Sequence, residues 1–173
     1  MSLHIRPAVK DDCQVILKFI QDLALFEKAP DSCVATLEGL ESTLGFTGPQ
    51  YARAIVAETT ESRDRVVPVG IAIYFYNYST WHAAPGIWLE DLYIDPQFRG
   101  RGYGTTILRF LAREVKKIGG KRLEWCVLKW NQKAIDVYTG KHVGAEIMEE
   151  WQTCRADGDK LDRMASMYDA KSA

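Results

Sequence analysis

The stretch Arg99-Gly100-Arg101-Gly102-Tyr103-Gly104 separates two segments with different hydrophobic periodicity. Residues 87–94 before it are rich in branched and aromatic side chains, which is typical of a strand. After it, apolar side chains recur at helical spacing until a glycine pair ends the helix: Ile107, Leu108, Leu111, Val115, Ile118 and Gly119-Gly120. Closely spaced glycines between a strand and a helix leave several amide N–H groups pointing outward. This arrangement predicts an anion-binding turn at the helix N-terminus.

Three kinds of anion site share such a turn. A nucleotide-binding P-loop would need a Gly-Lys-Ser/Thr ending, whereas Gly104 is followed by Thr105-Thr106, so this interpretation fails. A dinucleotide-binding turn would place its third glycine one residue later and would follow a parallel strand that opens the domain, so it fits poorly. The third kind is a coenzyme A pyrophosphate site, to which Arg99 and Arg101 would add positive charge. Its alternative is a tight turn with solvated arginines.

The segments on either side of this turn predict one mixed sheet. On the N-terminal side we expect a strand at residues 3–6, a helix from the capping pair Asp11-Asp12 to Glu27, a weaker helix at 36–44, and an antiparallel hairpin of 51–58 and 66–76. On the C-terminal side we expect a strand at 122–128, a helix at 131–138, and a strand at 145–153 before a polar hairpin at Asp157-Gly158. The expected fold is α+β (α/β), with a mixed central sheet flanked by helices on both faces.

Length and composition favour one intracellular domain. The 173 residues, 47% of them hydrophobic, can bury one substantial core, so we expect a single domain over residues 1–173. The formal net charge of −1 provides no bulk positive field, which argues against nucleic acid or an anionic membrane as partner. Four cysteines stand far apart and three histidines lack metal-ligand spacing, so we expect no metal and a reducing, cytoplasmic location. Residues 1–10 offer neither a secretory apolar core nor a membrane span.

The glycine turn and the segments around it resemble the GCN5-related N-acetyltransferase (GNAT) superfamily. Residues 99–104 satisfy that family's signature of an arginine or glutamine, two residues, a glycine, one residue, and a glycine or alanine. The similarity is closest to polyamine (diamine) acetyltransferases and to their relatives that act on thialysine, and it runs over nearly the whole chain. Its other motifs are IRPA at 5–8, LFE at 25–27, LEDLYI at 89–94, WN at 130–131 and AIDVY at 134–138.

This resemblance implies acetyl-CoA as co-substrate and no metal. The residues that would contact acetyl-CoA are Leu92, Tyr93 and Ile94 of the strand, Arg99, Gly100, Arg101, Gly102, Tyr103, Gly104 and Thr105 of the turn, and Asn131, Ala134 and Tyr138 of the later helix. In this superfamily the strand splays away from its neighbour near residues 92–94, which frees backbone groups for the ligand. Asn131 also suits a helix N-cap, so it needs no ligand to explain it.

The chemistry requires a proton acceptor and a proton donor. An alkyl ammonium with a pKa of about 10.4 is almost fully protonated at pH 7, so a base must act before attack. By the resemblance, Glu90 would assist amine deprotonation and Tyr138 would protonate the departing thiolate. Glu90 and Asp91 are neighbours on a strand, so we expect their side chains to point to opposite sides of the sheet. The structural alternatives are an edge position or a salt bridge for the strand carboxylate, and an ordinary core aromatic with its hydroxyl satisfied for Tyr138.

The same resemblance predicts the residues that bind the amine: Phe26, Glu27, Glu90, Asp91, Glu124, Trp125, Cys126 and Glu150. A polyamine carries several positive charges, so its site should gather carboxylates. The sequence departs from the polyamine enzymes at two places. The spacing from Tyr138 to Gly144 is two residues longer than usual, and Phe26 stands where those enzymes often carry tyrosine.

We therefore predict an acetyl-CoA-dependent N-acetyltransferase that acts by direct transfer on a primary amine of a small basic substrate such as a polyamine. The alternative acceptors are thialysine, another amino-acid-like amine or a protein lysine. A different class of function is a binding module that senses acetyl-CoA without turnover, and the presence of both Glu90 and Tyr138 argues against it. The resemblance also implies a homodimer, since members commonly pack or exchange C-terminal strands.

Overall fold

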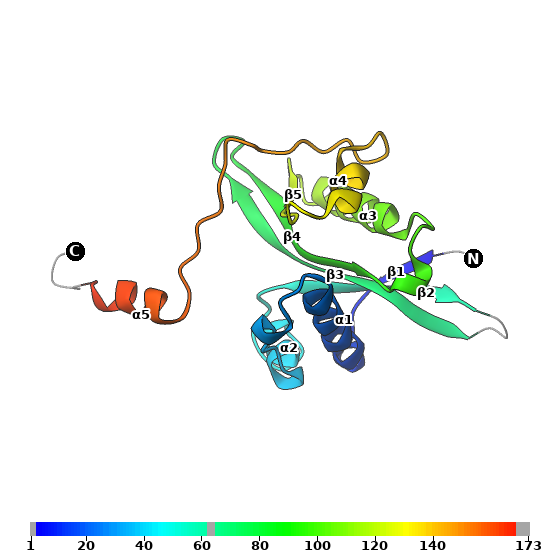
Figure 1. Cartoon of the computed structure of the whole chain (residues 1–173), viewed down its shortest axis with the longest axis horizontal. Helices are drawn as coiled ribbons and strands as arrows, with labels where there is room; N and C mark the ends of the chain where they lie inside the picture. Colours follow the sequence, from blue (N-terminus) through cyan, green and yellow to red (C-terminus); the bar gives the residue numbers. More distant parts are fainter. Residues whose placement is uncertain (1–2, 62–64, 169–173) are drawn as a thin grey trace.

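A five-stranded sheet forms the centre of the computed structural model, which describes residues 3–61 and 65–168 (Figure 1). Its strands lie in chain order: β1 (Leu3–Pro7), β2 (Arg53–Thr60), β3 (Val66–Ser79), β4 (Ala84–Ile94) and β5 (Leu123–Trp125). Neighbours pair antiparallel from β1 to β4, and β4 pairs with β5 in parallel. A parallel pair needs a crossover connection, which α3 (Tyr103–Lys117) provides.

Helices cover both faces of this sheet (Figure 1). α1 (Cys13–Phe26) and α2 (Leu37–Thr43) lie on one face, whereas α3 and α4 (Gln132–Thr139) lie on the other. Short 3-10 turns connect the larger elements: η1 (Lys10–Asp12), η2 (Pro30–Ser32) and η4 (Pro96–Phe98). α5 (Gly158–Ser166) stands away from the body at the end of an extended segment.

Each face of the sheet carries its own apolar core. On the α1 face, Ile16 and Phe19 of the helix pack with Tyr93 and other residues of the sheet. On the α3 face, a larger cluster joins Ile107 and Leu111 to buried residues of β2, β3 and β4. Both of these α3 residues belong to the helical face that the sequence predicts. Apolar burial on both faces holds the sheet as the middle of three layers.

Arg6 of β1 fixes the start of α1 against the sheet. Its guanidinium forms ion pairs with Asp12, at 2.6 Å between Nη1 and Oδ2, and with Glu58 of β2, at 2.6 Å between Nη2 and Oε1. The hydrogen bond from Arg6 lowers the pKa of Asp12 below its ordinary value. Asp12 also accepts the Val9 N–H at 2.7 Å, so this predicted capping residue binds the turn that precedes the helix.

Most predicted elements are confirmed, with shifted ends. The α+β class, the helices on both faces, the antiparallel N-terminal strands and the late crossover are all present. The expected weak helix at 36–44 is α2, whose N-cap Thr36 accepts the Gly39 N–H at 3.1 Å. The expected strand at 122–128 is shorter, because the described register of β5 with β4 spans three residue pairs.

The expected strand at residues 145–153 is wrong, because this described segment forms no strand. A strand needs a neighbour for its hydrogen bonds, and in the described sheet β5 is the edge with nothing beyond it. The predicted hairpin at Asp157-Gly158 is instead the start of α5. Trp151 packs edge-on against Trp81 of the β3–β4 turn, with 6.3 Å between ring centroids. We call residues 145–168 the C-terminal arm.

Candidate active site

β4 and β5 diverge after three residue pairs. Their parallel register ends with Leu89 opposite Trp125, whereas β4 continues to Ile94 alongside β3. On the side that faces β5, the backbone groups of residues 90–94 therefore have no ladder partner among the described strands. The structure thus contains the splayed strand that the family resemblance predicts.

A β-bulge at Glu90 changes the side-chain alternation of β4. The register against β3 steps by one residue between Leu89 and Asp91, so Glu90 is the extra residue. Leu89 before the bulge and Leu92 after it both pack on the α3-face core. Their neighbours Glu90 and Asp91 consequently both lie on the α1 side. The expectation that these carboxylates point to opposite sides is wrong, because it assumes unbroken alternation.

Three carboxylates form a cluster on this side: Glu90 and Asp91 of β4, and Glu27 just after α1. Burial, assisted by the negative charges of Glu90 and Glu27, raises the pKa of Asp91 to about 6. Partial burial also raises the pKa of Glu27. Glu90 is more exposed, and its Oε2 accepts the Trp88 indole N–H at 2.8 Å. Such a cluster attracts a cation and can accept a proton near neutral pH.

Tyr138 reaches the same region from the other face of the sheet. It lies half-buried in the last turn of α4, and its ring packs edge-on against Trp125 with 5.2 Å between centroids. Burial and the negative charge of Glu27 raise the pKa of its hydroxyl, so this group is protonated at neutral pH. The negative charge of Glu27 thus acts on both Asp91 and Tyr138.

The two extra residues after Tyr138 lie in the loop beyond α4. The helix ends at Thr139, and Gly140 is its C-cap. A Cβ at Gly140 would lie 2.7 Å from the Asp136 carbonyl oxygen, so the close approach requires glycine. The Ala145 N–H donates a hydrogen bond to the Tyr138 carbonyl at 2.9 Å, which closes the loop. The longer spacing therefore leaves Tyr138 within the helix.

The glycine turn leaves open space in front of the α3 N-terminus. Gly100 and Gly102 have left-handed φ angles of 76° and 78°, which favour glycine. A Cβ added at Gly100, Gly102 or Gly104 would meet nothing within 4 Å. The Thr106 N–H bonds to the Gly102 carbonyl at 3.0 Å, so the amides of residues 103–105 precede the first intrahelical bond and point outward. These amides and the open space fit a diphosphate such as that of coenzyme A.

Arg99 links the turn to the aromatic side chains of the site. Its Nε donates to the Ile94 carbonyl at 2.8 Å, and its guanidinium lies over the rings of Phe26 and Tyr93, at 5.2 and 5.5 Å from their centroids. Phe26 in turn contacts the ring of Trp130, with 5.6 Å between centroids. These contacts bring together the end of α1, the end of β4 and the segment before α4.

The other predicted cofactor residues contribute main-chain or helix-end groups. The side chains of Tyr93 and Tyr103 are buried in the two cores, which leaves their main-chain groups for a ligand. Arg101 donates from Nη2 to the Gln97 carbonyl at 3.3 Å. Asn131 is the N-cap of α4, as the sequence predicts, and its Oδ1 accepts an amide N–H at 3.3 Å. Two further residues are half-buried in the first turns of α3 and α4: Thr105 and Ala134.

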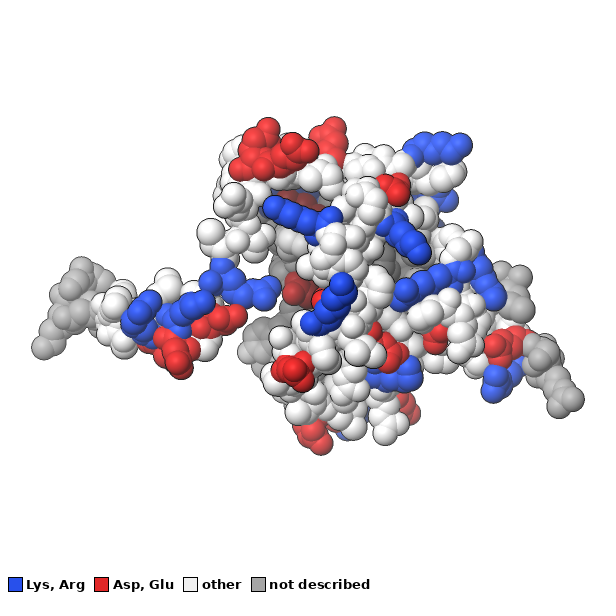
Figure 2. Space-filling model, in the orientation of Figure 1, with Lys and Arg blue, Asp and Glu red and all other residues white. Residues whose placement is uncertain are grey.

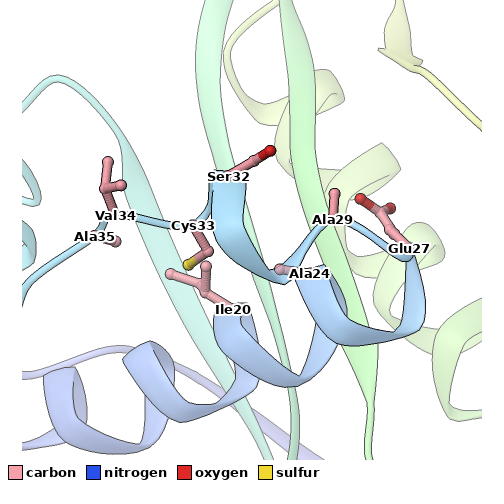
Figure 3. Close-up of a pocket in the computed structure, with 8 residues that line it drawn as sticks. All are labelled: Ile20, Ala24, Glu27, Ala29, Ser32, Cys33, Val34 and Ala35. Carbon is pink, nitrogen blue, oxygen red and sulfur yellow. The ribbon is translucent and has the colours of Figure 1, made fainter.

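A hollow of about 480 Å³ opens beside Glu27 (Figure 3). It lies between the last turns of α1 and the segment that leads to α2. Its lining residues are Ile20, Ala24, Glu27, Ala29, Ser32, Cys33, Val34 and Ala35. Because most of these side chains are apolar, the hollow suits an alkyl chain whose charged end meets the Glu27 carboxylate.

Two predicted substrate-binding acids do not join the carboxylate cluster. Glu124 pairs with Arg122, at 2.7 Å from Nε to Oε2, and accepts the Asn77 amide at 2.7 Å, so its charge is already balanced. Glu150 lies on the C-terminal arm next to Trp151, which contacts the β3–β4 turn. Along β4, that turn is about 20 Å from the bulge at Glu90, so Glu150 lies far from the carboxylate cluster. Cys126 is exposed just after β5.

Sequence reasoning missed Trp88 and most residues of the hollow. Trp88 stands two residues before Glu90, and residues i and i+2 of a strand share a face, so this spacing could have indicated their hydrogen bond. The hollow gives no such signal, because it depends on how η2 folds back over α1.

Figure 2 shows charges of both signs mixed over most of this face. The segment after α4 differs, because it carries a group of acidic side chains: Glu146, Glu149 and Glu150 are exposed there. Within residues 3–61 and 65–168, no group of three or more His, Cys, Asp or Glu side chains is arranged to hold a metal ion. None of the helices described here has the length and apolar character to cross a membrane.

Comparison with known proteins places these residues in context. The profile of the Acetyltransferase (GNAT) family matches residues 21–145, a range that includes the carboxylate cluster, the glycine turn and Tyr138. The thialysine N-epsilon-acetyltransferase of Mus musculus is 34% identical over 95% of this chain and 98% of its own length. The L-ornithine N5-acetyltransferase of Arabidopsis thaliana is 30% identical over 93% and 87%. The spermidine/spermine N(1)-acetyltransferase-like protein 1 of Homo sapiens is 29% identical over 94% of this chain and 24% of its own length.

Solved structures share the fold at lower sequence identity. An integron cassette protein from the mobile metagenome of V. cholerae has a TM-score of 0.73 and 22% identity, and the match covers 95% of this chain and 98% of that one. The crystal structure of a probable acetyltransferase has a TM-score of 0.70 and 16% identity, over 90% and 98% of the two chains. These similarities support the arrangement of sheet and helices described above.

Replacing Asp91 with asparagine should stabilise the fold at neutral pH. The folded-state pKa of about 6 lies above the ordinary 3.8, so the buried carboxylate opposes folding above pH 6, and this cost disappears below about pH 4. We expect Asp91→Asn to raise the free energy of unfolding at pH 7 by about 1–3 kcal/mol, a gain that vanishes near pH 4. Denaturant unfolding at pH 4, 5.5 and 7 measures this difference.

The exposed Asp31→Asn variant is the control and should leave the pH dependence of stability unchanged. An Asp91→Asn protein that is less stable than the wild type at every pH would contradict the placement of a desolvated carboxylate in this cluster.

Proposed function

The chain belongs to the acetyltransferase (GNAT) family and is an N-acetyltransferase, and we propose that it acetylates the terminal amine of a small amino-acid-like substrate. The observation that carries this proposal is the cluster of Glu27, Glu90 and Asp91 next to Tyr138, at the gap between β4 and β5. The carboxylates would hold a cationic amine and remove its proton, and the tyrosine would supply a proton to the leaving group.

The choice of substrate rests on the named relatives and on the site. The thialysine and ornithine enzymes are named for amino acids with a terminal amine, and they match 95% and 93% of this chain. The spermidine/spermine-related protein matches 94% of this chain at 29% identity, compared with 34% and 30% for the other two. Glu124 and Glu150, which would favour a polycation, do not join the cluster. These observations support an amino-acid-like amine better than the polyamine that the sequence motifs favour.

Enzymes of this family use acetyl-CoA, whose thioester supplies the activated acetyl group. The amides of residues 103–105 and the open space at the glycines would hold the pyrophosphate, with Arg99 and Arg101 nearby. The unpaired edge of residues 92–94 would bind the pantetheine chain through N–H and C=O groups. Asn131 and Ala134, in the first turn of α4, would complete this side of the site.

Asp91 is the base in this proposal. A carboxylate with a pKa of about 6 is ionised at pH 7 and basic enough to accept a proton from the substrate ammonium, directly or through water. The amine lone pair then attacks the acetyl carbonyl carbon, so that a C–N bond forms and the C–S bond breaks. Tyr138 donates its proton to the departing sulfur, and its raised pKa keeps that proton in place until then. The nitrogen loses its second proton as the amide forms, and this proton would return to Tyr138 through water.

Glu90 and Glu27 hold the substrate cation in this proposal. The family resemblance gives Glu90 the role of base, but Glu90 is exposed and its Oε2 is engaged by the Trp88 indole. An oxygen that already accepts the indole N–H is less available to accept a proton from the substrate. The negative charge of Glu90 nevertheless attracts an ammonium, and Glu27 adds a second charge from the end of α1.

We also propose that two chains assemble through their C-terminal arms. The arm carries apolar side chains that are at least half exposed in the single chain: Ile147, Met148, Trp151, Leu161, Met164, Met167 and Tyr168. Contact of this apolar surface with water is unfavourable, and a second copy would cover it symmetrically. The open edge of β5 offers main-chain groups to the partner's arm. The cytoplasmic location stays a prediction from the sequence.

The purified protein should release free thiol from acetyl-CoA fastest with amino acids that carry a terminal amine. We expect kcat/KM for thialysine or ornithine to exceed that for spermidine by at least about tenfold, because the cluster has too few free acids for a polycation. A thiol reagent follows turnover, and mass spectrometry locates the acetyl group on the terminal nitrogen. No release of thiol with any of the amines, or a higher kcat/KM for spermidine, would contradict the proposal.

The Tyr138→Phe variant should lose turnover without losing the co-substrate. We expect kcat to fall by about 100-fold, because the departing thiolate lacks its proton donor, while the Kd for acetyl-CoA stays within about twofold. Calorimetric titration measures that Kd, and Tyr78→Phe, on an exposed part of β3, serves as the control. An unchanged kcat in Tyr138→Phe would remove this residue from the mechanism.

Light scattering coupled to size exclusion should give twice the 19.6 kDa mass of one chain. The Ile147→Asp variant should shift the mass toward one chain, because it places a charge on the apolar surface of the arm. Val66→Asp changes an equally exposed apolar residue away from the arm and should leave the mass unchanged. A wild-type protein that elutes with the mass of one chain at every concentration would rule out the assembly.

A further inference from the structure

Lys28 adopts a backbone conformation that normally belongs to glycine. It directly follows Glu27, the C-cap of α1, and has a left-handed φ of 63°. The Ala29 N–H bonds to the Ala24 carbonyl at 2.9 Å and the Lys28 N–H to the Leu25 carbonyl at 3.1 Å, which is the Schellman pattern of a helix end. An L-residue with a side chain at this position is strained, since its Cβ crowds the backbone. The sequence thus keeps a lysine where glycine would fit with less strain.

The Lys28 ammonium lies against the aromatic side chains of the site. Its Nζ lies 5.1 Å from the centroid of the Trp130 ring, a cation–π contact that holds the charge in place. The same ring contacts Phe26, whose other neighbour is Arg99 of the glycine turn. An ammonium over a ring face keeps N–H donors free on its outer side. Lys28 therefore presents a cation over the Trp130 ring, one residue along the chain from Glu27 of the carboxylate cluster.

This cation has no carboxylate of its own within the described chain. The ion pairs formed by residues 3–61 and 65–168 include none with Lys28, although the neighbouring Glu27 carries a carboxylate. Glu27 instead influences Asp91 and Tyr138 deeper in the site. The site thus separates its charges, with three carboxylates at the end of α1 and on β4 and the Lys28 ammonium over Trp130.

Such a separation suits a zwitterion better than a polycation. A diamine brings a positive charge at each end, and its outer end would be repelled by Lys28. An amino acid with a terminal amine brings an ammonium at one end and an α-carboxylate beside an α-ammonium at the other. That outer end is neutral overall, and its carboxylate can pair with Lys28. The apolar hollow is lined by Glu27 and Ala29, the residues on either side of Lys28, and would take the alkyl chain of the substrate.

We propose that Lys28 is a specificity-determining residue that pairs with the α-carboxylate of the substrate while Glu27, Glu90 and Asp91 bind its terminal ammonium. This inference rests on the proposed function of the same site. It adds that the carboxylate of the substrate is recognised directly, so amino acids are selected over the diamines that lack it.

Ornithine and putrescine test the proposal as a matched pair, because they differ only in the carboxylate. The Lys28→Gly variant should lower kcat/KM for ornithine by about fivefold or more, chiefly through KM, and should leave putrescine unchanged or slightly improved. Lys28→Arg keeps the charge and should retain most of the preference for ornithine. Lys116→Ala removes an exposed lysine at the far end of α3 and should alter neither substrate.

Thermal unfolding separates this effect from a loss of structure. Because glycine relieves the left-handed strain, Lys28→Gly should unfold at the same temperature as the wild type or higher. Equal effects of Lys28→Gly on ornithine and putrescine, or no effect on either, would overturn the proposal.

Calorimetric binding of ornithine and putrescine gives the same comparison without turnover. Binding of ornithine that depends on Lys28, in a protein that acetylates neither compound, would support this inference and count against the proposed function. Tighter binding of putrescine than of ornithine by the wild type would overturn the role of Lys28 whatever the turnover.

Discussion

β4 and β5 stay hydrogen-bonded for three residue pairs and then diverge, and the candidate site exists because of this divergence. Unpaired main-chain groups need a partner, so residues 90–94 leave an edge that a ligand or water must satisfy. The divergence also lets side chains from opposite faces of the sheet approach each other. Glu27 comes from the α1 layer and Tyr138 from the α4 layer (Figure 1). The bulge at Glu90 completes the site by placing Asp91 on the side of Glu27.

The two apolar cores hold these polar groups in partly buried positions, which the groups would otherwise leave in order to be hydrated. Asp91 lies between Leu89 and Tyr93, which are buried on opposite faces of the sheet. Packing on both faces fixes β4, so Asp91 cannot turn outward to recover its hydration. The raised pKa of Asp91 is the consequence of that restraint. The unfavourable environment of the carboxylate and its proposed use as a base would thus have one origin, a common relation between stability and activity in enzymes.

The sequence predicts those parts of the structure that depend on local patterns. The strand, glycine turn and α3 follow from periodicity and from Gly100 and Gly102, and the N-cap at Asn131 follows from its side chain. The bulge at Glu90 does not, because it arises from the register with β3, and only the register places both acids on one side. The ion pair of Glu124 with Arg122 and the missing strand at 145–153 likewise depend on tertiary neighbours. Family resemblance supplies residue roles but not these geometries.

The position of the C-terminal arm in the sequence affects the order in which parts of the protein fold during synthesis. Synthesis proceeds from the N-terminus, so the sheet and both helical layers can be complete before residues 145–168 leave the ribosome. The apolar side chains of the arm therefore emerge beside a finished body that leaves them exposed. In the proposed assembly of two chains, the time that they remain in water would depend on the supply of chains in the cell rather than on the folding rate of the body. Abundance would thereby control exposure to chaperones and proteases.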